Sequence, residues 1–466
     1  MCVFAASLTT TAAAQEKFEQ GKPNISSYRY LDDYQALKNY INYAKYPNFK
    51  LGIGTTVNDY LSNSTFRSLV NKNFTETVAG NAMKMQSCVD NNGNMNFETV
   101  KKYVKAATEA GLNVYGHTLA WHSQQPTVWL RKLVANKNGT PLSQQERLDT
   151  LVYAMDKWIK GMMEACDGKV KAWDLVNEAI SGGGNDGQGN YVLQGNNPNG
   201  NPGNTWDVGG DNFYWQDYMG SLEYVRQACR LARKYGPEDI KLFINDYNLE
   251  SDWDNNQKVK SLVGWIQKWE ADGVTRIDGI GTQMHISCFE NDDILNSIKQ
   301  HITSMFEIMA ASGKLCRVSE MDMGYVRGNN RWGSSIKTSQ LTESEHKKMA
   351  DFYEWIIKEY LRIIPAEQQW GICQWCPFDA ADMSYIWRHS EPVGIWDQSY
   401  YRKHAYAGFV RGLGGEVFTA INSIKADKAI DTSKSIYNLN GVRMQATSVD
   451  ALPSGIYIVN GKKIVK

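Results

Sequence analysis

Eight short apolar runs recur along this chain of 466 residues, separated by stretches with helical periodicity. The runs expected to form strands are Leu51–Val57, Ala79–Met85, Leu112–Trp121, Val170–Glu178, Lys241–Asn248, Gly279–Ser287, Leu315–Met323 and Gly371–Asp379. The amphipathic stretches between them include Phe97–Ala110, Glu146–Ala165, Asp217–Lys234, Asn256–Asp272, Ile294–Ser312 and Thr342–Ile364. Strands that alternate with helices imply right-handed crossovers and a parallel sheet. Eight such repeats predict a closed (β/α)8 barrel, a TIM barrel of the α/β class.

Polar side chains collect where these apolar runs end. The active site of a (β/α)8 barrel lies at the C-terminal ends of its strands. The residues at or near these ends that could bind a sugar or move a proton are Asn81, Lys84, His117, Trp121, Asn177, Glu178, Asp246, Tyr247, Gln283, His285, Glu320 and Trp375. Polar residues scattered through a core would not gather at one end, so the pattern predicts a single site on that face.

Two of the runs close in a glutamate. The run Lys171–Glu178 ends in Asn-Glu, and the run Leu315–Met323 ends in Glu320 followed two residues later by an aspartate. An ionised carboxylate is costly to remove from water, so a buried strand that ends in one requires a reason. Two glutamates that face one cavity can cleave a glycosidic bond, because one protonates the leaving oxygen and the other attacks the sugar or activates water. For either residue alone, the alternative is a solvated strand end or a buried ion pair.

The composition fits a sugar-binding protein. Aromatic residues make up 12% of the chain, with 15 Trp and 25 Tyr, and aromatic faces pack against the apolar C–H faces of pyranose rings. Ordinary core packing is the alternative. The 50 basic and 50 acidic residues balance, which gives no indication of a nucleic-acid or membrane-surface partner. The chain contains no run of about 18 apolar residues, so the sequence predicts no membrane-spanning helix.

The eight cysteines show no disulfide or metal-binding pattern. Cys373 and Cys376 form the one close pair, and in an extended segment their side chains point to opposite faces. Buried free thiols are therefore expected. Neither a metal ion nor an organic cofactor is expected, since no Cys/His ligand set occurs and the chemistry needs none.

Two segments outside the strand and helix pattern bear on export and on the cleft. Residues 1–14 are mostly apolar and small and end in three alanines before Gln15, which resembles a signal-peptidase site. Because the basic region is missing, we expect a signal-peptide remnant whose start lies upstream, with a disordered N-terminus as the alternative. Ser181–Asp211, rich in Gly, Asn and Asp, follows Glu178 as a loop that either shapes the cleft or is a neutral insertion.

The pattern changes after Leu413. Strand-like runs occur at Ser435–Leu439, Gly455–Val459 and Lys462–Lys466, and an Asn-Gly pair follows each of the first two. Asn-Gly between apolar runs is the strongest short-range hairpin signal. The sequence therefore predicts a catalytic barrel over residues 15–414, a linker over 415–430 and a small C-terminal β module over 431–466.

Several segments match the motifs of one known family in order and in spacing. They are Gly116–Gln124 (GHTLAWHSQ), Trp173–Glu178 (WDLVNE), Asn245–Asn248 (NDYN), Ile277–His285 (IDGIGTQMH) and Ser319–Asp322 (SEMD). From about Tyr30 to Leu413 the chain resembles glycoside hydrolase family 10. The resemblance implies a (β/α)8 barrel and an endo-β-1,4-xylanase that retains anomeric configuration. It also implies xylan or a related β-1,4-linked polysaccharide as the substrate.

The resemblance assigns roles around the cleaved bond. Glu178 would be the general acid/base and Glu320 the nucleophile, with carboxyl groups about 5–5.5 Å apart as in retaining enzymes. Asn177 would bind the 2-hydroxyl of the sugar, a contact that strengthens in the transition state. His285 would help to keep Glu320 ionised, and Gln283 would lie beside the acid/base.

The resemblance also implies sugar contacts on both sides of that bond. The residues expected on the donor side are Asn81, Lys84, His117, Trp121 and Trp375, the last as a wall or platform. Tyr247 is expected on the leaving-group side. Trp387 is an aromatic candidate on the last loop, with plain packing as its alternative, and His122 is expected to be structural.

Two positions depart from the family pattern, and two other functions remain open. Gly80 stands where a glutamate is usual and Met85 where an aromatic residue is usual, so distal donor-side binding is expected to differ. The first alternative is another retaining β-1,4-glycanase such as an endoglucanase. Glucose carries a C6 hydroxymethyl group that xylose lacks, so the depth of the sugar pocket near Trp375 and Trp387 decides between the two substrates. The second is a non-catalytic polysaccharide-binding barrel, which has no need for two desolvated glutamates.

The C-terminal tail resembles a second family. Ile436–Gly441 and Leu452–Lys463 are similar to the C-terminal sorting domain of the type IX secretion system in Bacteroidetes. The resemblance implies an exported bacterial protein, secreted or at the cell surface, and we expect a monomer. The alternatives for the tail are a vestigial pair of sandwich strands or a fragment of a carbohydrate-binding module.

Overall fold

The computed structural model describes residues 19–135, 137–195 and 212–415. In the tail it describes residues 436–438, 443–444, 452, 455–459 and 462–465. The chain divides into two compact units, Met1–Glu416 and Val417–Lys466, and each is described by itself. The predicted signal-peptide remnant, nearly all of the predicted linker and residues 196–211 of the polar loop lie outside the described residues.

The first unit is a closed parallel barrel. Its strands are β1 (Lys50–Thr55), β2 (Glu76–Ala79), β3 (Asn113–Gly116), β4 (Ala172–Asn177), β5 (Lys241–Asp246), β6 (Gly279–Thr282), β8 (Leu315–Val326) and β9 (Gln369–Gln374). They are ordered β6-β5-β4-β3-β2-β1-β9-β8, and the pairing of β6 with β8 closes the ring. One extra strand, β7 (His285–Phe289), pairs in parallel with the outer part of β8. The predicted (β/α)8 barrel is confirmed.

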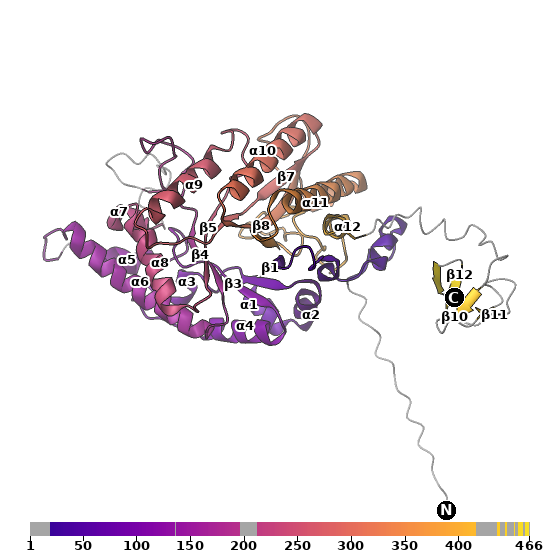
Figure 1. Ribbon diagram of the computed structural model, residues 1–466, viewed down its shortest axis with the longest axis horizontal. Helices are drawn as coiled ribbons and strands as arrows, with labels where there is room; N and C mark the ends of the chain where they lie inside the picture. The colour runs from indigo at the N-terminus through magenta and orange to yellow at the C-terminus, as the bar shows by residue number, and fades with distance from the viewer. Residues whose placement is uncertain are drawn as a thin grey trace, which may run out of the picture. The chain divides into compact units, whose positions relative to one another are not determined.

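Helices follow the strands and surround the barrel (Figure 1). They are α1 (Val57–Ser62), α2 (Ser64–Asn73), α3 (Met85–Cys88), α4 (Glu98–Glu109), α5 (Thr127–Leu133), α6 (Gln144–Cys166), α7 (Trp215–Met219), α8 (Glu223–Tyr235), α9 (Gln257–Glu270), α10 (Asp292–Ala311), α11 (Glu343–Ile363) and α12 (His404–Gly412). Short 3-10 helices lie at Ser26–Asp33, Leu37–Tyr40 and Thr338–Gln340. The two longest helices, α6 and α11, begin with Ser-x-x-Glu and Thr-x-x-Glu capping boxes, which satisfy backbone donors in the first turn.

Three predicted strands differ clearly from the observed ones, and the third run, Leu112–Trp121, forms a strand only over Asn113–Gly116. The second strand, β2, ends at Ala79, so the predicted run Ala79–Met85 is mostly a turn, in which Lys84 N donates to Asn81 O. Gly and Asn favour turns and disfavour strands. The sixth run is divided between β6 and β7 at Met284, whose φ of 56° places it in the left-handed region.

The interior of the barrel is filled with side chains. Val78, Tyr115, Ala172, Phe243 and Cys373 form a buried cluster within it. Beside it, Arg317 forms a buried ion pair with Glu76, and its guanidinium lies 3.8 Å from the Tyr115 ring centroid. A packed interior is typical of this fold, whose substrates bind at the C-terminal ends of the strands.

The second unit contains a four-stranded antiparallel sheet. Its strands are β10 (Ile436–Asn438), β11 (Arg443–Met444), β12 (Ile456–Val459) and β13 (Lys462–Val465), in the order β11-β10-β12-β13. The strands β10, β12 and β13 fall within the three predicted runs, and β11 was not predicted. Among the residues described in either unit, no helix is long and apolar enough to cross a membrane.

Candidate active site

Glu178 directly follows β4 at the C-terminal end of the barrel. Its φ is 56°, and its backbone N–H donates to Asn245 O at 2.7 Å on the neighbouring strand. The carboxylate accepts three hydrogen bonds from neutral donors: Trp121 Nε1 at 3.0 Å, Gln283 Nε2 at 2.9 Å and Asn177 Nδ2 at 3.1 Å. Glu178 is thus held by groups from three separate strand ends while 17% of its side chain stays exposed.

Glu320 lies within β8 and is more deeply buried, with 5% of its surface exposed. Its carboxylate accepts from Asn245 Nδ2 at 2.8 Å and lies 3.3 Å from His285 Nε2. Burial alone would raise the pKa of this carboxyl. The hydrogen bond from His285 and the positive charge of nearby side chains outweigh burial and lower the pKa below its usual value. The site therefore favours an ionised Glu320.

Asn245 connects the two glutamates. Its Nδ2 donates both to Glu320 Oε1 and to Asn177 Oδ1, the latter at 2.9 Å, and Asn177 in turn donates to Glu178. Ser319 Oγ donates to Asn245 Oδ1 at 2.6 Å and fixes the amide. The two carboxylates are therefore the ends of one hydrogen-bonded chain, which places them on the same cavity.

No role was predicted for Asn245, although it begins one of the family motifs. The available signal was an amide placed directly after the apolar residues Leu242, Phe243 and Ile244 of β5, where the structure buries it completely. Gly281 on β6 makes room for this amide, since a Cβ at that position would lie 2.5 Å from Asn245 Oδ1.

Behind Glu320, His285 is held between two carboxylates. Its Nδ1 lies 3.0 Å from Asp322 Oδ2, while its Nε2 faces Glu320. Burial alone would lower the pKa of His285, but Asp322 and Glu320 together raise it to about 10. Burial would raise the pKa of Asp322, but His285 and Arg388 hold it at about 2. His285 is thus an imidazolium at neutral pH and supplies positive charge beside Glu320.

Trp387 belongs to this same group of side chains. Its indole Nε1 donates to Asp322 Oδ2 at 2.9 Å, and its ring centroid lies 4.9 Å from that of His285. The side chain is nevertheless 53% exposed. Trp387 therefore lines the site. A residue that served only core packing would not be half exposed.

The residues predicted on the donor side lie around the loops after β2 and β3. Lys84 Nζ donates to Asn81 Oδ1 at 3.0 Å and to Gln124 Oε1 at 2.6 Å, and it lies 4.9 Å from the Trp121 ring centroid. Burial lowers the pKa of Lys84, against the opposing charges of Glu320 and Glu178. These contacts bring Asn81, Lys84 and Trp121 to the cavity of the two glutamates.

His117 and Trp375 pack against each other beside this cavity. His117 Nδ1 is 2.8 Å from Oδ2 of the buried Asp174, which fixes the imidazole. The Trp375 ring centroid is 5.7 Å from that of His117 and 6.5 Å from that of His285, with edge-to-face geometry in both pairs. Trp375 thus forms a wall against both histidines.

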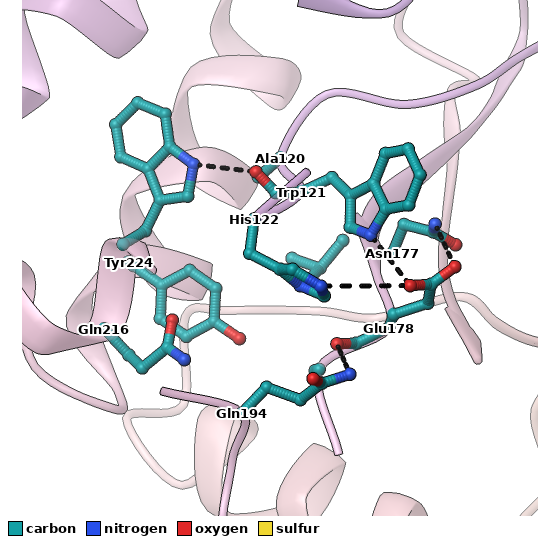
Figure 2. A pocket seen from close by; sticks show the side chains of 11 residues that line it. Ala120, Trp121, His122, Asn177, Glu178, Gln194, Gln216 and Tyr224 are labelled. Atoms are coloured by element: carbon teal, nitrogen blue, oxygen red, sulfur yellow. Dashed lines mark hydrogen bonds and ion pairs between the residues drawn. The ribbon is translucent and has the colours of Figure 1, made fainter. Parts of the chain in front are cut away.

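A pocket opens beside Glu178 (Figure 2). Its lining residues include Trp121, His122, Asn177, Glu178, Gln194, Trp215, Gln216 and Tyr224. His122, expected to be structural, stacks on Tyr214 with centroids 4.9 Å apart and reaches within 4.0 Å of Glu178 Oε2. Gln194 donates to Glu178 O at 3.0 Å and lies 3.5 Å from the hydroxyl of Tyr247, so Tyr247 lies next to a residue that lines the pocket.

One cysteine lies at the edge of the site, where Cys376 Sγ is 3.7 Å from Asp322 Oδ2. Cys373 and Cys376 are free thiols, as are the other cysteines that the structure describes. Within the described ranges, no group of three or more His, Cys, Asp or Glu residues is arranged to hold a metal ion.

A closed parallel barrel whose C-terminal end carries two glutamates joined by hydrogen bonds is the architecture of the barrel glycoside hydrolases. The particular family follows from a match of residues 41–411 to the model of glycosyl hydrolase family 10. The chain belongs to that family.

Two curated relatives and one solved structure illustrate the similarity. The chain is 28% identical over 380 residues to endo-beta-1,4-xylanase Xyn10C of Cellvibrio japonicus, covering 79% of this chain and 56% of that protein. It is 28% identical to a thermostable celloxylanase of Thermoclostridium stercorarium, covering 77% and 84%. Native xylanase 10C of Cellvibrio japonicus superposes with a TM-score of 0.65 at 25% identity, covering 83% of this chain and 74% of that one. The match therefore spans little more than half the length of Xyn10C.

Proposed function

We propose that this protein is an endo-β-1,4-xylanase that hydrolyses internal bonds of xylan with retention of configuration. The observation that carries the proposal is the hydrogen-bonded chain from Glu178 through Asn177 and Asn245 to Glu320. It joins a carboxylate surrounded by neutral donors to one beside an imidazolium. A retaining glycosidase needs this division, with one group that exchanges a proton and one that stays ionised.

The reaction proceeds in two displacements. In the first, Glu320 attacks the anomeric carbon, the bond from that carbon to the leaving oxygen breaks, and Glu178 donates its proton to that oxygen. A glycosyl ester on Glu320 results. In the second, Glu178 takes a proton from water, the oxygen of water attacks the same carbon, and Glu320 leaves as a carboxylate. Two inversions give net retention.

The names of the relatives support xylan as the substrate, since the two curated relatives are a xylanase and a celloxylanase. A mutant of xylanase 10C was also solved in complex with xylopentaose. The name celloxylanase, and that of the relative Exoglucanase XynX of Acetivibrio thermocellus, keep β-1,4-glucan as the second candidate. A non-catalytic binder is disfavoured because it would gain nothing from burying Glu320 beside His285.

The deciding experiment is a parallel assay of reducing-sugar release from xylan, carboxymethylcellulose and mannan, with product configuration followed by NMR. Release from xylan with β-configured first products is expected. Faster release from carboxymethylcellulose would favour the glucanase, and an inverted first product would contradict the two-step reaction. Binding to xylan with no release at all would favour the non-catalytic barrel.

We also propose that the protein is exported and acts as a monomer outside the cell, with the C-terminal β module as a type IX sorting domain. The motif resemblance of the tail supports this role, as does the division of the chain after Glu416. A chain that ends at Ala426 should keep its specific activity and its melting temperature but remain inside cells of an expressing Bacteroidetes host. Normal export of the shortened chain would contradict the sorting role, and a collapse of the barrel would make the tail integral to it.

A further inference from the structure

Lys258 is a buried cation at an unfavourable position. It is the second residue of α9, and only 1% of its side chain is exposed. The N-terminus of a helix carries a partial positive charge, so a cation there is destabilised rather than stabilised. A buried ammonium also loses its hydration. A lysine kept in such a place must be held by specific partners.

The first partner is Asp246, the last residue of β5. Lys258 Nζ lies 2.8 Å from Asp246 Oδ1, and both side chains are buried. Asp246 Oδ2 accepts from the backbone N–H of Ile180 at 2.9 Å. Ile180 is two residues beyond Glu178, so the ion pair also holds the segment that carries the acid/base.

The second partner is the ring of Tyr247. Lys258 Nζ lies 3.4 Å from its centroid, well within the range of a cation–π contact. Tyr247 N donates to Asp246 Oδ1 at 2.9 Å, so the backbone and the ring of Tyr247 are both tied to the same ion pair. One ammonium thus fixes the tyrosine predicted to face the leaving sugar and, through Asp246, the chain beside Glu178.

We propose that Lys258 is a positioning residue for the leaving-group side of the cleft, where it orients Tyr247 against the departing xylose. This inference rests on the proposed xylanase function and extends it. A substrate with a sugar in that position uses the oriented ring. An aryl glycoside with a good leaving group has no sugar there and needs little acid catalysis, so its hydrolysis should depend far less on Lys258.

The chain offers a matched control in a second buried lysine–aspartate pair. Lys403 Nζ binds Asp379 and donates to Pro392 O at 2.9 Å and Gly394 O at 2.8 Å. Both members of the pair are buried, and neither belongs to the groups described around Glu178 and Glu320. Substitutions in this pair should affect stability alone.

The test compares kcat/KM for xylohexaose and for 2,4-dinitrophenyl xylobioside in purified full-length variants. Lys258→Met should lower the ratio of kcat/KM for xylohexaose to kcat/KM for the aryl xylobioside at least about tenfold, as expected for loss of a desolvated cation–π contact. Lys258→Arg keeps a cation beneath the ring and should leave the ratio within about twofold of wild type. Lys403→Met should leave the ratio unchanged even if it lowers the melting temperature by as much as Lys258→Met does.

The design covers variants that fold poorly, since Lys258→Met leaves Asp246 buried without its cation. The double variant Asp246→Asn/Lys258→Met removes both charges and should show the same loss of ratio, against Asp379→Asn/Lys403→Met as its control. An unchanged ratio in a folded Lys258→Met or Asp246→Asn/Lys258→Met variant would overturn the positioning role while leaving the xylanase function intact. Failure of the wild type to cleave either substrate would overturn both.

Discussion

The surroundings of the two glutamates differ in charge. Glu178 accepts hydrogen bonds from an indole, a glutamine and an asparagine, all neutral. Glu320 is more deeply buried and lies beside the His285 imidazolium. Protonation of Glu320 would leave His285 without one of its two carboxylates, so this glutamate is the one that the site holds ionised. The proposed division of roles between the two glutamates rests on this difference in their neighbours.

The largest expected effects come from removing each carboxylate in turn. Glu320→Ala should abolish xylan hydrolysis, and azide should restore part of it with an inverted product, because the anion attacks from the vacated side. Glu178→Ala should lower turnover of xylan by about 10²–10⁴-fold yet retain activity on aryl glycosides with good leaving groups. Near-normal turnover of xylan by Glu320→Ala would end the assignment of the nucleophile.

Asn245→Asp should make the surroundings of the two glutamates more alike. A carboxylate beside Glu320 Oε1 would raise the pKa of Glu320 by like-charge repulsion, so the acid limb of the kcat/KM profile should move to higher pH. At the wild-type optimum the loss should be about 10²-fold, comparable to removing one preorganised donor.

Asn245→Ala is the control for this substitution, because it removes the same hydrogen bonds without adding a charge. It should lower activity and move the acid limb to higher pH by less than Asn245→Asp does, because it removes a hydrogen bond to the ionised Glu320 but adds no charge. Equal pH profiles for the two variants would contradict like-charge repulsion between Glu320 and the introduced carboxylate.

His285 should make stability depend on pH. Its pKa in the folded protein is about 10, above the ordinary 6.5, so its charge stabilises the fold fully below about pH 6.5 and progressively less as pH rises towards 10. Asp322, whose pKa is held at about 2 from 3.8, stabilises the fold above about pH 4 and loses this effect as pH falls towards 2. The difference in melting temperature between wild type and His285→Gln should be several degrees at pH 6 and shrink by pH 10. A difference independent of pH would contradict the raised pKa.

The smallest expected effect concerns Gly80, in the turn that follows β2. A Cβ there would meet only Thr55 O, at 3.4 Å, so Gly80→Glu should fold normally and offer a hydrogen-bond acceptor to a second donor-side xylose. Water can fill part of this role, so a gain of only a few-fold in kcat/KM on linear xylo-oligosaccharides, relative to arabinose- or glucuronate-bearing xylan, is expected. An unchanged ratio in a folded variant would show that Gly80 does not set tolerance of decoration.

The barrel could be predicted because its repeats are local patterns. Apolar runs and amphipathic helices are visible within windows of about 11 to 18 residues. The barrel topology then brings the polar residues at the strand ends together on one face. Features that join distant segments could not be predicted in this way. The strand β2 begins at Glu76, ahead of the predicted run, and Glu76 is buried in an ion pair with Arg317, which is far along the chain. No local sequence pattern marks a charged residue whose burial depends on an ion pair with such a distant partner.

The site was predictable to the extent that its side chains carry distinctive chemical groups. Glu178 is recognisable as a carboxylate at the end of an apolar run, and Glu320 as one near the end of another, although the structure continues β8 past it to Val326. Asn245 was missed because its function is to connect them, and a buried amide in an apolar strand has no distinct chemical signature. Lys258 was missed for the same reason, since its contact with Tyr247 depends on how α9 returns to the end of β5.

The length of β8 has a further consequence. Glu320 lies in the middle of a twelve-residue strand that pairs with β6 before it, with β7 after it and with β9 on its other edge. The pairing on both sides of Glu320 fixes the backbone from which its side chain projects, so the carboxylate can move only by rotation about its own side-chain bonds. In the proposed reaction the anomeric carbon would therefore cover most of the distance between the leaving oxygen and the nucleophile.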